Sequence, residues 1–204
     1  MLPEFDLSGK TVLITGAGRG IGKGIALALA EAGADVAVTS LTEANAARVA
    51  ESVRRLGRRG LGYSADSMKL AEMEAVAKKL LAEFGHLDTL INCVGDAIPG
   101  PVAPFPDKET RAISEADWHA IIDINLTQAF VGCHVFGPHL IEQRGGSVIN
   151  ISSFAALRPS AYSTAYASAK TGLLRFTESL ALEWAPSASA STASRQAPSP
   201  MWKA

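Results

Sequence analysis

The glycine-rich segment TGAGRGIG, residues 15–22, constrains the fold of this chain more than any other feature. It follows Lys10–Thr15, a short apolar and β-branched run that predicts a buried strand. It precedes Ile21–Ala32, an Ala- and Leu-rich run that predicts a helix closed by Gly33. Glycines between a strand and a helix allow a pyrophosphate to approach the free N–H groups of the helix. The segment therefore predicts a dinucleotide-binding loop, and the alternative is an ordinary strand–helix turn.

Short apolar runs alternate with longer amphipathic runs along the rest of the chain. Further strands are predicted at 35–39, 61–65, 87–91 and 147–151, and further helices at 43–56, 67–84, 114–143 and 164–184. Strands that alternate with helices favour right-handed crossovers. We therefore expect an α/β fold with a Rossmann-like doubly wound parallel sheet, in which residues 1–186 form one dinucleotide-binding and catalytic domain.

The composition disfavours several classes of protein. Of 204 residues, 48% are hydrophobic and 19% charged, which is typical of a globular chain. Lys and Arg number 19 against 20 Asp and Glu, so we expect no nucleic-acid partner. The N-terminus does not resemble a signal peptide and no apolar run reaches about 18 residues, so we expect a cytoplasmic protein without a membrane segment. Two cysteines, Cys93 and Cys133, fit a reducing compartment. The histidines show no metal-ligand spacing, and no metal is expected.

Two segments break the alternation. Residues 96–115 carry Pro99, Pro101, Pro104 and Pro106 and form a long loop, either a binding loop or lid or a plain surface insertion. Residues 187–200 consist almost entirely of Ser, Ala and Pro without periodicity, so we expect the tail 187–204 to be disordered.

The end of the second strand bears on the choice of dinucleotide. NAD sites usually place an acidic residue there to bind the ribose hydroxyls, but this strand ends Thr39-Ser40-Leu41. Arg19 in the glycine loop is able to pair with a 2′-phosphate, and its alternative is a solvated loop arginine. We therefore expect NADP(H) to be favoured over NAD(H).

Three residues suggest proton transfer. Tyr166 and Lys170 are four residues apart on the last predicted helix, so they share a face. A lysine ammonium favours the phenolate and lowers the pKa of a neighbouring tyrosine. Ser153 follows the fifth strand, where open α/β sheets bind ligands, and its hydroxyl is able to orient a substrate carbonyl. The alternative for the tyrosine and lysine is a pair on the helix surface.

Taken in order, these motifs resemble the short-chain dehydrogenase/reductase family, in its shorter classical type. The resemblance covers about residues 7–186 and rests on TGAGRGIG at 15–22, NCVG at 92–95, Asn125, and Ser153 ahead of Tyr166 in YASAK. It implies an oxidoreductase that transfers hydride between a nicotinamide and a carbonyl or secondary alcohol. The usual form of the second motif is NNAG, from which Cys93-Val94 departs.

The resemblance also assigns roles to single residues. Tyr166 becomes the general acid and base, and Lys170 both modulates it and holds the nicotinamide ribose. Ser153 positions the substrate oxygen, and Asn125 holds a water that links Lys170 to solvent. The implied cofactor-binding set is Gly16, Gly18, Arg19, Gly20, Ile21, Gly22, Ser40, Asp66, Asn92, Gly95, Tyr166 and Lys170.

Two of these positions have further interpretations. Asp66 matches a carboxylate that contacts adenine in the family, and it is also a candidate N-cap for the helix predicted at 67–84. Asn92 and Gly95 match a motif that steadies the central sheet and lets the cofactor approach.

The chain departs from the family after ALEWAP, residues 181–186. Family members typically continue with GIRVNxIAPG, a sixth strand and a Pro-Gly turn, and then a helix and a seventh strand. We therefore expect this chain to lack the last two strands. Codons can be chosen for 187–200 whose shifted frame encodes GIRVNGIAPGTVP, so a single-base deletion at codon 187 is a hypothesis that gene sequencing tests.

Three functions follow as expectations. The first is an oxidoreductase of small carbonyl or alcohol substrates, impaired by the tail and assembled as a dimer or tetramer. The second is a non-catalytic dinucleotide-binding or dimerising module, because the helices that bear Asn125 and Tyr166 resemble those that pair subunits in the family. The third is a misfolded product without function. The substrate itself is not identified by the sequence.

Overall fold

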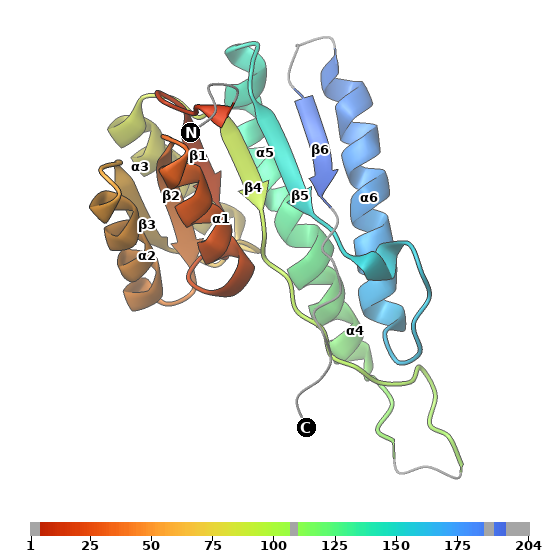
Figure 1. Cartoon of the computed structure of the whole chain (residues 1–204). Helices are drawn as coiled ribbons and strands as arrows, with labels where there is room; N and C mark the ends of the chain where they lie inside the picture. Colours follow the sequence, from red (N-terminus) through yellow and green to blue (C-terminus); the bar gives the residue numbers. More distant parts are fainter. Residues whose placement is uncertain (1–4, 107–109, 186–189, 195–204) are drawn as a thin grey trace.

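The computed structural model describes residues 5–106, 110–185 and 190–194, with the last segment described as backbone only. Strands and helices alternate along the chain as the sequence predicts (Figure 1). The strands are β1 (Thr11–Ile14), β2 (Asp35–Ser40), β3 (Gly60–Ser64), β4 (Thr89–Asn92), β5 (Ser147–Ile151) and β6 (Ala190–Ser194). The helices are α1 (Gly20–Glu31), α2 (Glu43–Arg55), α3 (Leu70–Phe84), α4 (Glu115–Ile122), α5 (Gln128–Glu142) and α6 (Thr164–Trp184).

The described strands form one parallel sheet in the order β3-β2-β1-β4-β5-β6. The chain moves outward from β1 to β3 and then crosses back to β4, so the order reverses between β1 and β4. Ligands of doubly wound sheets bind outside the carboxyl ends of the strands at such a reversal. The predicted doubly wound α/β fold is confirmed.

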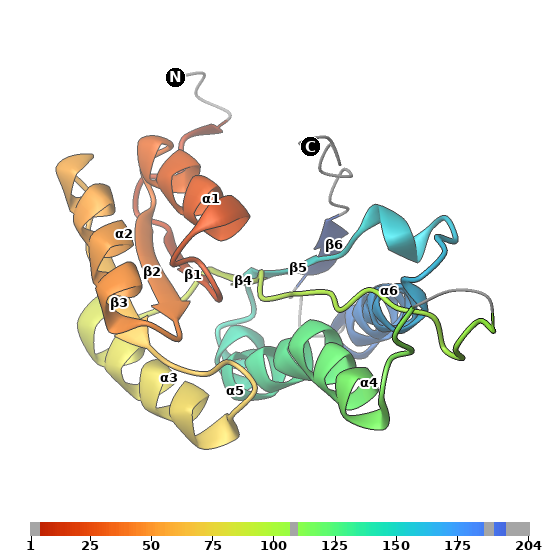
Figure 2. The same ribbon diagram turned by 90° about the horizontal axis from the view of Figure 1, so that it is seen from below.

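Helices cover both faces of the sheet in two separate apolar layers. On one face α1 and α2 pack against Val12, Ile14, Val36 and Val38, which alternate along β1 and β2. On the other face α3, α5 and α6 pack around Leu13 and the neighbouring strands. Figure 2 shows α1 on one side of the sheet and α3, α4, α5 and α6 on the other. This arrangement leaves the strand ends free to form a site.

A π-helical turn, Asp123–Thr127, separates α4 from α5 within the single helical stretch predicted at 114–143. Thr127 donates a side-chain hydrogen bond to Asp123 Oδ1 at 2.8 Å across this turn. Glu115–Glu142 is the one helical stretch of the described chain that is long and apolar enough to cross a membrane. Half of its most apolar window is buried, and α5 packs on α3, as the core helix of a soluble protein does.

The strand β6 corrects an expectation for the tail. Residues 190–194 pair in parallel with β5, from Ser147 opposite Ala190 to Ile151 opposite Ser194. They therefore occupy the sixth position of the sheet, which we expected to be empty, beside β5 in Figure 1. The reason is that main-chain groups alone complete such a ladder. Residues 187–189 and 195–204 lie outside the described part of the chain.

Candidate active site

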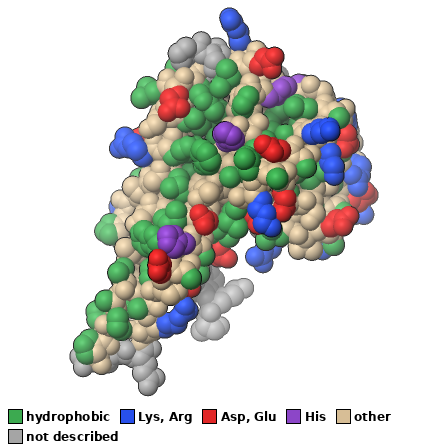
Figure 3. Space-filling view, turned by 180° about the vertical axis from the view of Figure 1, so that it is seen from behind, with side chains coloured by type: hydrophobic (Ala, Val, Ile, Leu, Met, Phe, Trp, Pro, Cys, Tyr) green, Lys and Arg blue, Asp and Glu red, His purple; other side chains and the backbone are tan. Residues whose placement is uncertain are grey.

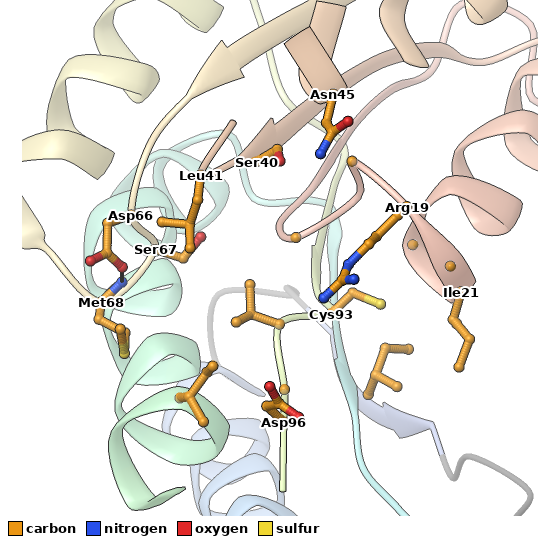
Figure 4. A pocket seen from close by; sticks show the side chains of 18 of the residues that line it. Arg19, Ile21, Ser40, Leu41, Asn45, Asp66, Ser67, Met68, Cys93 and Asp96 are labelled. Carbon is orange, nitrogen blue, oxygen red and sulfur yellow. Dashed lines mark hydrogen bonds between the residues drawn. The ribbon is translucent and has the colours of Figure 1, made fainter. Parts of the chain in front are cut away.

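A cavity of about 670 Å³ opens at the carboxyl ends of the strands. Its walls come from the glycine loop after β1 and the segments after β2, β3 and β4, together with the end of β5 and one face of α6 (Figure 4). The volume lies within the range of sites that bind small molecules and cofactors. Most of the residues singled out in the sequence therefore meet at one place.

The glycine loop forms one wall of this cavity. The lining residues from the loop are Gly16, Gly18, Arg19, Gly20, Ile21 and Gly22. Gly16 has φ +66°, and a Cβ there would lie 2.7 Å from Val94 Cγ2, so glycine is required for both conformation and space. Helix α1 begins at Gly20 without a side-chain cap and without an acidic residue in its first turn. Its first N–H groups are thus available to an anion.

Polar side chains at the end of β2 face the same loop. A Cβ on Gly18 would lie 2.4 Å from Ser40 Oγ and 2.9 Å from Asn45 Cβ. Arg19 follows Gly18, is exposed, and is directed into the cavity (Figure 4). Arg19, Ser40 and Asn45 therefore form a polar corner without a carboxylate among them.

Asp66 lines the cavity beyond the end of β3, and its helix-capping interpretation is wrong. Helix α3 begins at Leu70 with Lys69 as its N-cap, because the chain makes another turn first. Asp66 Oδ1 instead accepts the backbone N–H of Met68 at 3.0 Å within that turn. The Asp66 carboxylate stays partly exposed and is turned toward Met68 at the edge of the cavity (Figure 4).

Tyr166 and Lys170 line the cavity from α6, one helical turn apart. Lys170 Nζ lies 5.8 Å from the centroid of the Tyr166 ring and donates a hydrogen bond to the Ile151 carbonyl at 2.9 Å. Only 3% of Lys170 is exposed. Burial lowers the pKa of this lysine from 10.5 to about 8, partly offset by the Cys93 thiol. Lys170 is therefore held against the end of β5 by burial and by this hydrogen bond.

The π-helical turn places Asn125 against this lysine. Asn125 is fully buried, and its Nδ2 donates to the carbonyls of Asp96 at 2.7 Å and Ile121 at 2.8 Å. Its Oδ1 accepts no hydrogen bond from the described residues. A Cβ on Gly95 would lie 2.9 Å from Asn125 Oδ1 and 3.1 Å from Lys170 Nζ. Glycine at 95 thus leaves space between the amide and the ammonium.

Ser153 lies just outside the residues that line the cavity. It follows Ile151, which does line it, at the carboxyl end of β5. Its Oγ accepts the backbone N–H of Ala155 at 3.2 Å and caps the short 3-10 helix Phe154–Ala156. The Ser153 hydroxyl donates no hydrogen bond to a described residue.

Asn92 does not line the cavity. It is fully buried, and its Nδ2 donates to Asn150 Oδ1 at 2.8 Å on the neighbouring strand. Asn150 in turn donates to Thr177 Oγ1 on α6 at 2.9 Å. The asparagine therefore links β4, β5 and α6 and acts on a cofactor only through the position of these elements.

Several lining residues were not singled out by the sequence analysis. They are Leu41, Thr42, Asn45, Ala65, Ser67, Met68, Ala97, Ile124 and Ile151, while Cys93 and Val94 were noted for their departure from the family motif and not as site residues. Most of them follow a strand directly, so the rule that sheets bind ligands at strand ends was a usable signal. Of the loop 96–115, Asp96 and Ala97 line the cavity, and residues 107–109 lie outside the described chain. Among described residues, no cluster of three His, Cys, Asp or Glu is arranged to hold a metal.

Comparison with known proteins agrees with this geometry. A family model described as short chain dehydrogenase matches residues 10–191. The chain is 33% identical to 2-dehydro-3-deoxy-D-gluconate 5-dehydrogenase of Escherichia coli over 186 residues. The matched region covers 91% of this chain and 70% of that enzyme. It is 36% identical over 180 residues to a 3-oxoacyl-acyl-carrier-protein reductase of Chlamydia pneumoniae, covering 88% of this chain and 69% of that one.

Solved structures share the fold. A 7α-hydroxysteroid dehydrogenase in complex with NADH and a 7-oxo bile acid superimposes with a TM-score of 0.85 at 28% identity, over 95% of this chain and 73% of that one. An NAD⁺-bound xylitol dehydrogenase superimposes with a TM-score of 0.82 at 28% identity, over 91% and 70% of the two chains. The chain belongs to the short-chain dehydrogenase family of NAD(P)-dependent oxidoreductases, which act on alcohols and carbonyls.

Proposed function

We propose that this chain binds NADP(H) in the cavity and uses Tyr166 to move the proton that accompanies hydride transfer to or from a small substrate. The observation that carries the proposal is the position of Tyr166 and the buried Lys170, which line the cavity together with the glycine loop. A proton-transfer pair and an anion-binding helix terminus within one cavity match a reaction between a dinucleotide and a carbonyl.

The residues present fit a dinucleotide. A Cβ on Gly20 would meet no atom within 4 Å, so the loop leaves open space beside the uncapped N-terminus of α1 for a pyrophosphate. Asp66 beyond β3 faces the region where the adenine would lie. Lys170 on the opposite wall would hold the ribose of the nicotinamide. The unpartnered Asn125 Oδ1, next to the lining residue Gly95, is left for a polar ligand or water to satisfy.

The chain's own residues then divide the chemistry. When bound, the nicotinamide supplies or accepts the hydride. Tyr166 donates its hydroxyl proton to the substrate oxygen as a carbonyl is reduced, and takes the proton back as an alcohol is oxidised. The Lys170 ammonium stabilises negative charge on the Tyr166 oxygen. Ser153 donates a hydrogen bond to the same substrate oxygen, and Asn125 Oδ1 accepts one from a water that connects Lys170 to solvent.

A preference for NADP(H) follows from the corner formed by Arg19, Ser40 and Asn45. A 2′-phosphate there would accept hydrogen bonds from the guanidinium, the hydroxyl and the amide, with no carboxylate among the cavity residues at the end of β2 to repel it. Glu43, the nearest acid along the chain, is exposed and does not line the cavity. Loss of one charge-assisted contact is worth about 1.5–3 kcal/mol, or roughly 10- to 100-fold in affinity.

We also propose a cytoplasmic homo-oligomer, either a dimer or a tetramer. Figure 3 shows hydrophobic side chains spread over the face that carries α4, α5 and α6. Trp118, Phe130 and Leu182 are 36%, 52% and 79% exposed on these helices. Apolar surface of this extent favours association between copies. The two cysteines are free, as a reducing compartment requires. Light scattering of the purified chain measures the number of copies.

The function is tested by calorimetric titration with NADPH and NADH and by turnover of a panel of ketones and secondary alcohols. We expect NADPH to bind more tightly, and Arg19→Ala to weaken NADPH by about 10- to 100-fold while NADH changes little. Ser40→Asp should reverse the preference. Tyr166→Phe should retain NADPH binding and lose turnover. Absence of dinucleotide binding, or full turnover by Tyr166→Phe, would refute the proposal.

A further inference from the structure

The two cysteines of the chain occupy very different surroundings. Cys133 lies on α5, is 3% exposed, and receives a weak hydrogen bond from Asn92 at 3.6 Å. Cys93 follows β4 directly, is partly exposed, and lines the cavity (Figure 4). A reagent that enters the cavity therefore meets the Cys93 thiol and not the Cys133 thiol.

The position of Cys93 is fixed by its backbone. The Cys93 N–H donates to Thr15 Oγ1 at 3.1 Å, which ties the residue to the first position of the glycine loop. Burial raises the pKa of the Cys93 thiol, and the charge of Lys170 lowers it. The cavity that Cys93 lines is therefore the one that the glycine loop and Lys170 line as well.

A second observation points to a polar ligand or water beside this wall. Asn125 is fully buried, yet its Oδ1 accepts no hydrogen bond from any described residue. This oxygen is directed at Gly95, two residues beyond Cys93, where a Cβ would lie 2.9 Å from it. Gly95 lines the cavity as Cys93 does. A buried acceptor without a partner is costly unless a ligand or water satisfies it.

We propose that Cys93 is a covalent modification site for soft electrophiles, and that its adduct excludes the dinucleotide from the cavity. The inference rests on the proposed function, because it takes the cavity to be the dinucleotide site. With a maleimide, the thiol releases its proton to solvent and Cys93 Sγ forms a bond to one alkene carbon. The π electron pair moves to the neighbouring carbon, which takes a proton from water. No group leaves and no oxidant is needed.

The experiment uses the full chain and N-ethylmaleimide at pH 8.5, where more of the thiol is ionised than at pH 7. Intact mass and peptide mapping locate the adduct, and calorimetry measures NADPH binding before and after labelling. We expect a single adduct on Cys93, labelling at least about tenfold slower with saturating NADPH, and loss of NADPH binding by the labelled chain. Cys93→Ala, confirmed as folded by circular dichroism, should remain unlabelled under the same conditions.

Each contrary outcome has a distinct meaning. Labelling of Cys133 ahead of Cys93, or labelled protein that binds NADPH as tightly as before, overturns the inference and leaves the proposed function intact. Failure of the unlabelled chain to bind either dinucleotide refutes the proposed function, and with it the exclusion of a dinucleotide by the adduct. Equal labelling rates with and without saturating NADPH also overturn the inference, because a bound dinucleotide must cover the thiol.

Discussion

Replacing Lys170 with methionine is expected to stabilise the folded chain at neutral pH, although it removes a group that we propose to be catalytic. Lys170 is 3% exposed, and burial lowers its pKa from 10.5 to about 8. A pKa difference of one unit is worth about 1.4 kcal/mol. Keeping this ammonium charged in the folded chain therefore costs about 3 kcal/mol, which methionine avoids.

The pH dependence of this difference follows from where the proton is bound. Below pH 8 the lysine is charged in the folded and unfolded chains alike, so the full cost is present. Between pH 8 and 10.5 the unfolded chain keeps the proton and the folded chain loses it, so wild-type stability rises with pH. Methionine also loses the hydrogen bond to the Ile151 carbonyl, worth about 1 kcal/mol. The net gain is therefore about 2 kcal/mol at pH 7 and disappears by about pH 10.

Urea unfolding followed by tryptophan fluorescence at pH 7, 8, 9 and 10 measures both variants. Lys78→Met, on the exposed side of α3, is the matched control and should follow the wild type at every pH. The reasoning is refuted if Lys170→Met is less stable than the wild type at pH 7. A stability difference that stays constant from pH 7 to 10 refutes it as well.

Three further changes test the loop, the sheet and the edge strand. Gly18→Ala places a Cβ 2.4 Å from Ser40 Oγ, so NADPH affinity in a calorimetric titration should fall about tenfold or more; unchanged affinity would contradict this. Asn150→Ala leaves the Asn92 amide with only a weak sulfur acceptor, so the free energy of unfolding in urea should fall by about 1–3 kcal/mol. An unchanged free energy of unfolding would contradict this prediction. Ser191→Pro or Thr192→Pro removes a β5–β6 hydrogen bond, because alternate N–H groups face the neighbouring strand. Amide exchange in β5 should then accelerate, whereas Ser191→Ala should leave it unchanged.

The strand–helix alternation and the glycine loop could be predicted because both depend on local patterns. The strand at Ser147–Ile151 and the helix at Thr164–Trp184 have the predicted bounds. The stretch predicted at 114–143 is divided by a π-helical turn, and the other predicted elements differ by a few residues at their ends. Tyr166 and Lys170 could be paired from their spacing alone, because residues four positions apart on a helix lie on the same face.

Other parts of the site depend on contacts that no local pattern encodes. The residues around Asn125 favour a regular helix, and the π-helical turn that directs this amide at Gly95 arises from its buried contacts with Asp96 and Ile121. Asn92 could be matched to a motif, but its partner Asn150 lies 58 residues away on another strand. The capping interpretation of Asp66 failed because an additional turn precedes α3.

The strand β6 shows why composition was a poor guide at the edge of the sheet. Patterns of apolar residues predict strands that bury side chains, but a strand that completes an edge is held first by its main chain. The outer edge of β5 presents N–H and C=O groups that any extended segment without proline is able to pair, and residues 190–194 contain no proline. With β6 in place, β5 pairs with β4 as far as Asn150 and with β6 as far as Ile151. The carbonyl of Ile151 accepts a hydrogen bond from Lys170, so main-chain pairing at this edge helps to position this lysine whatever side chains β6 carries.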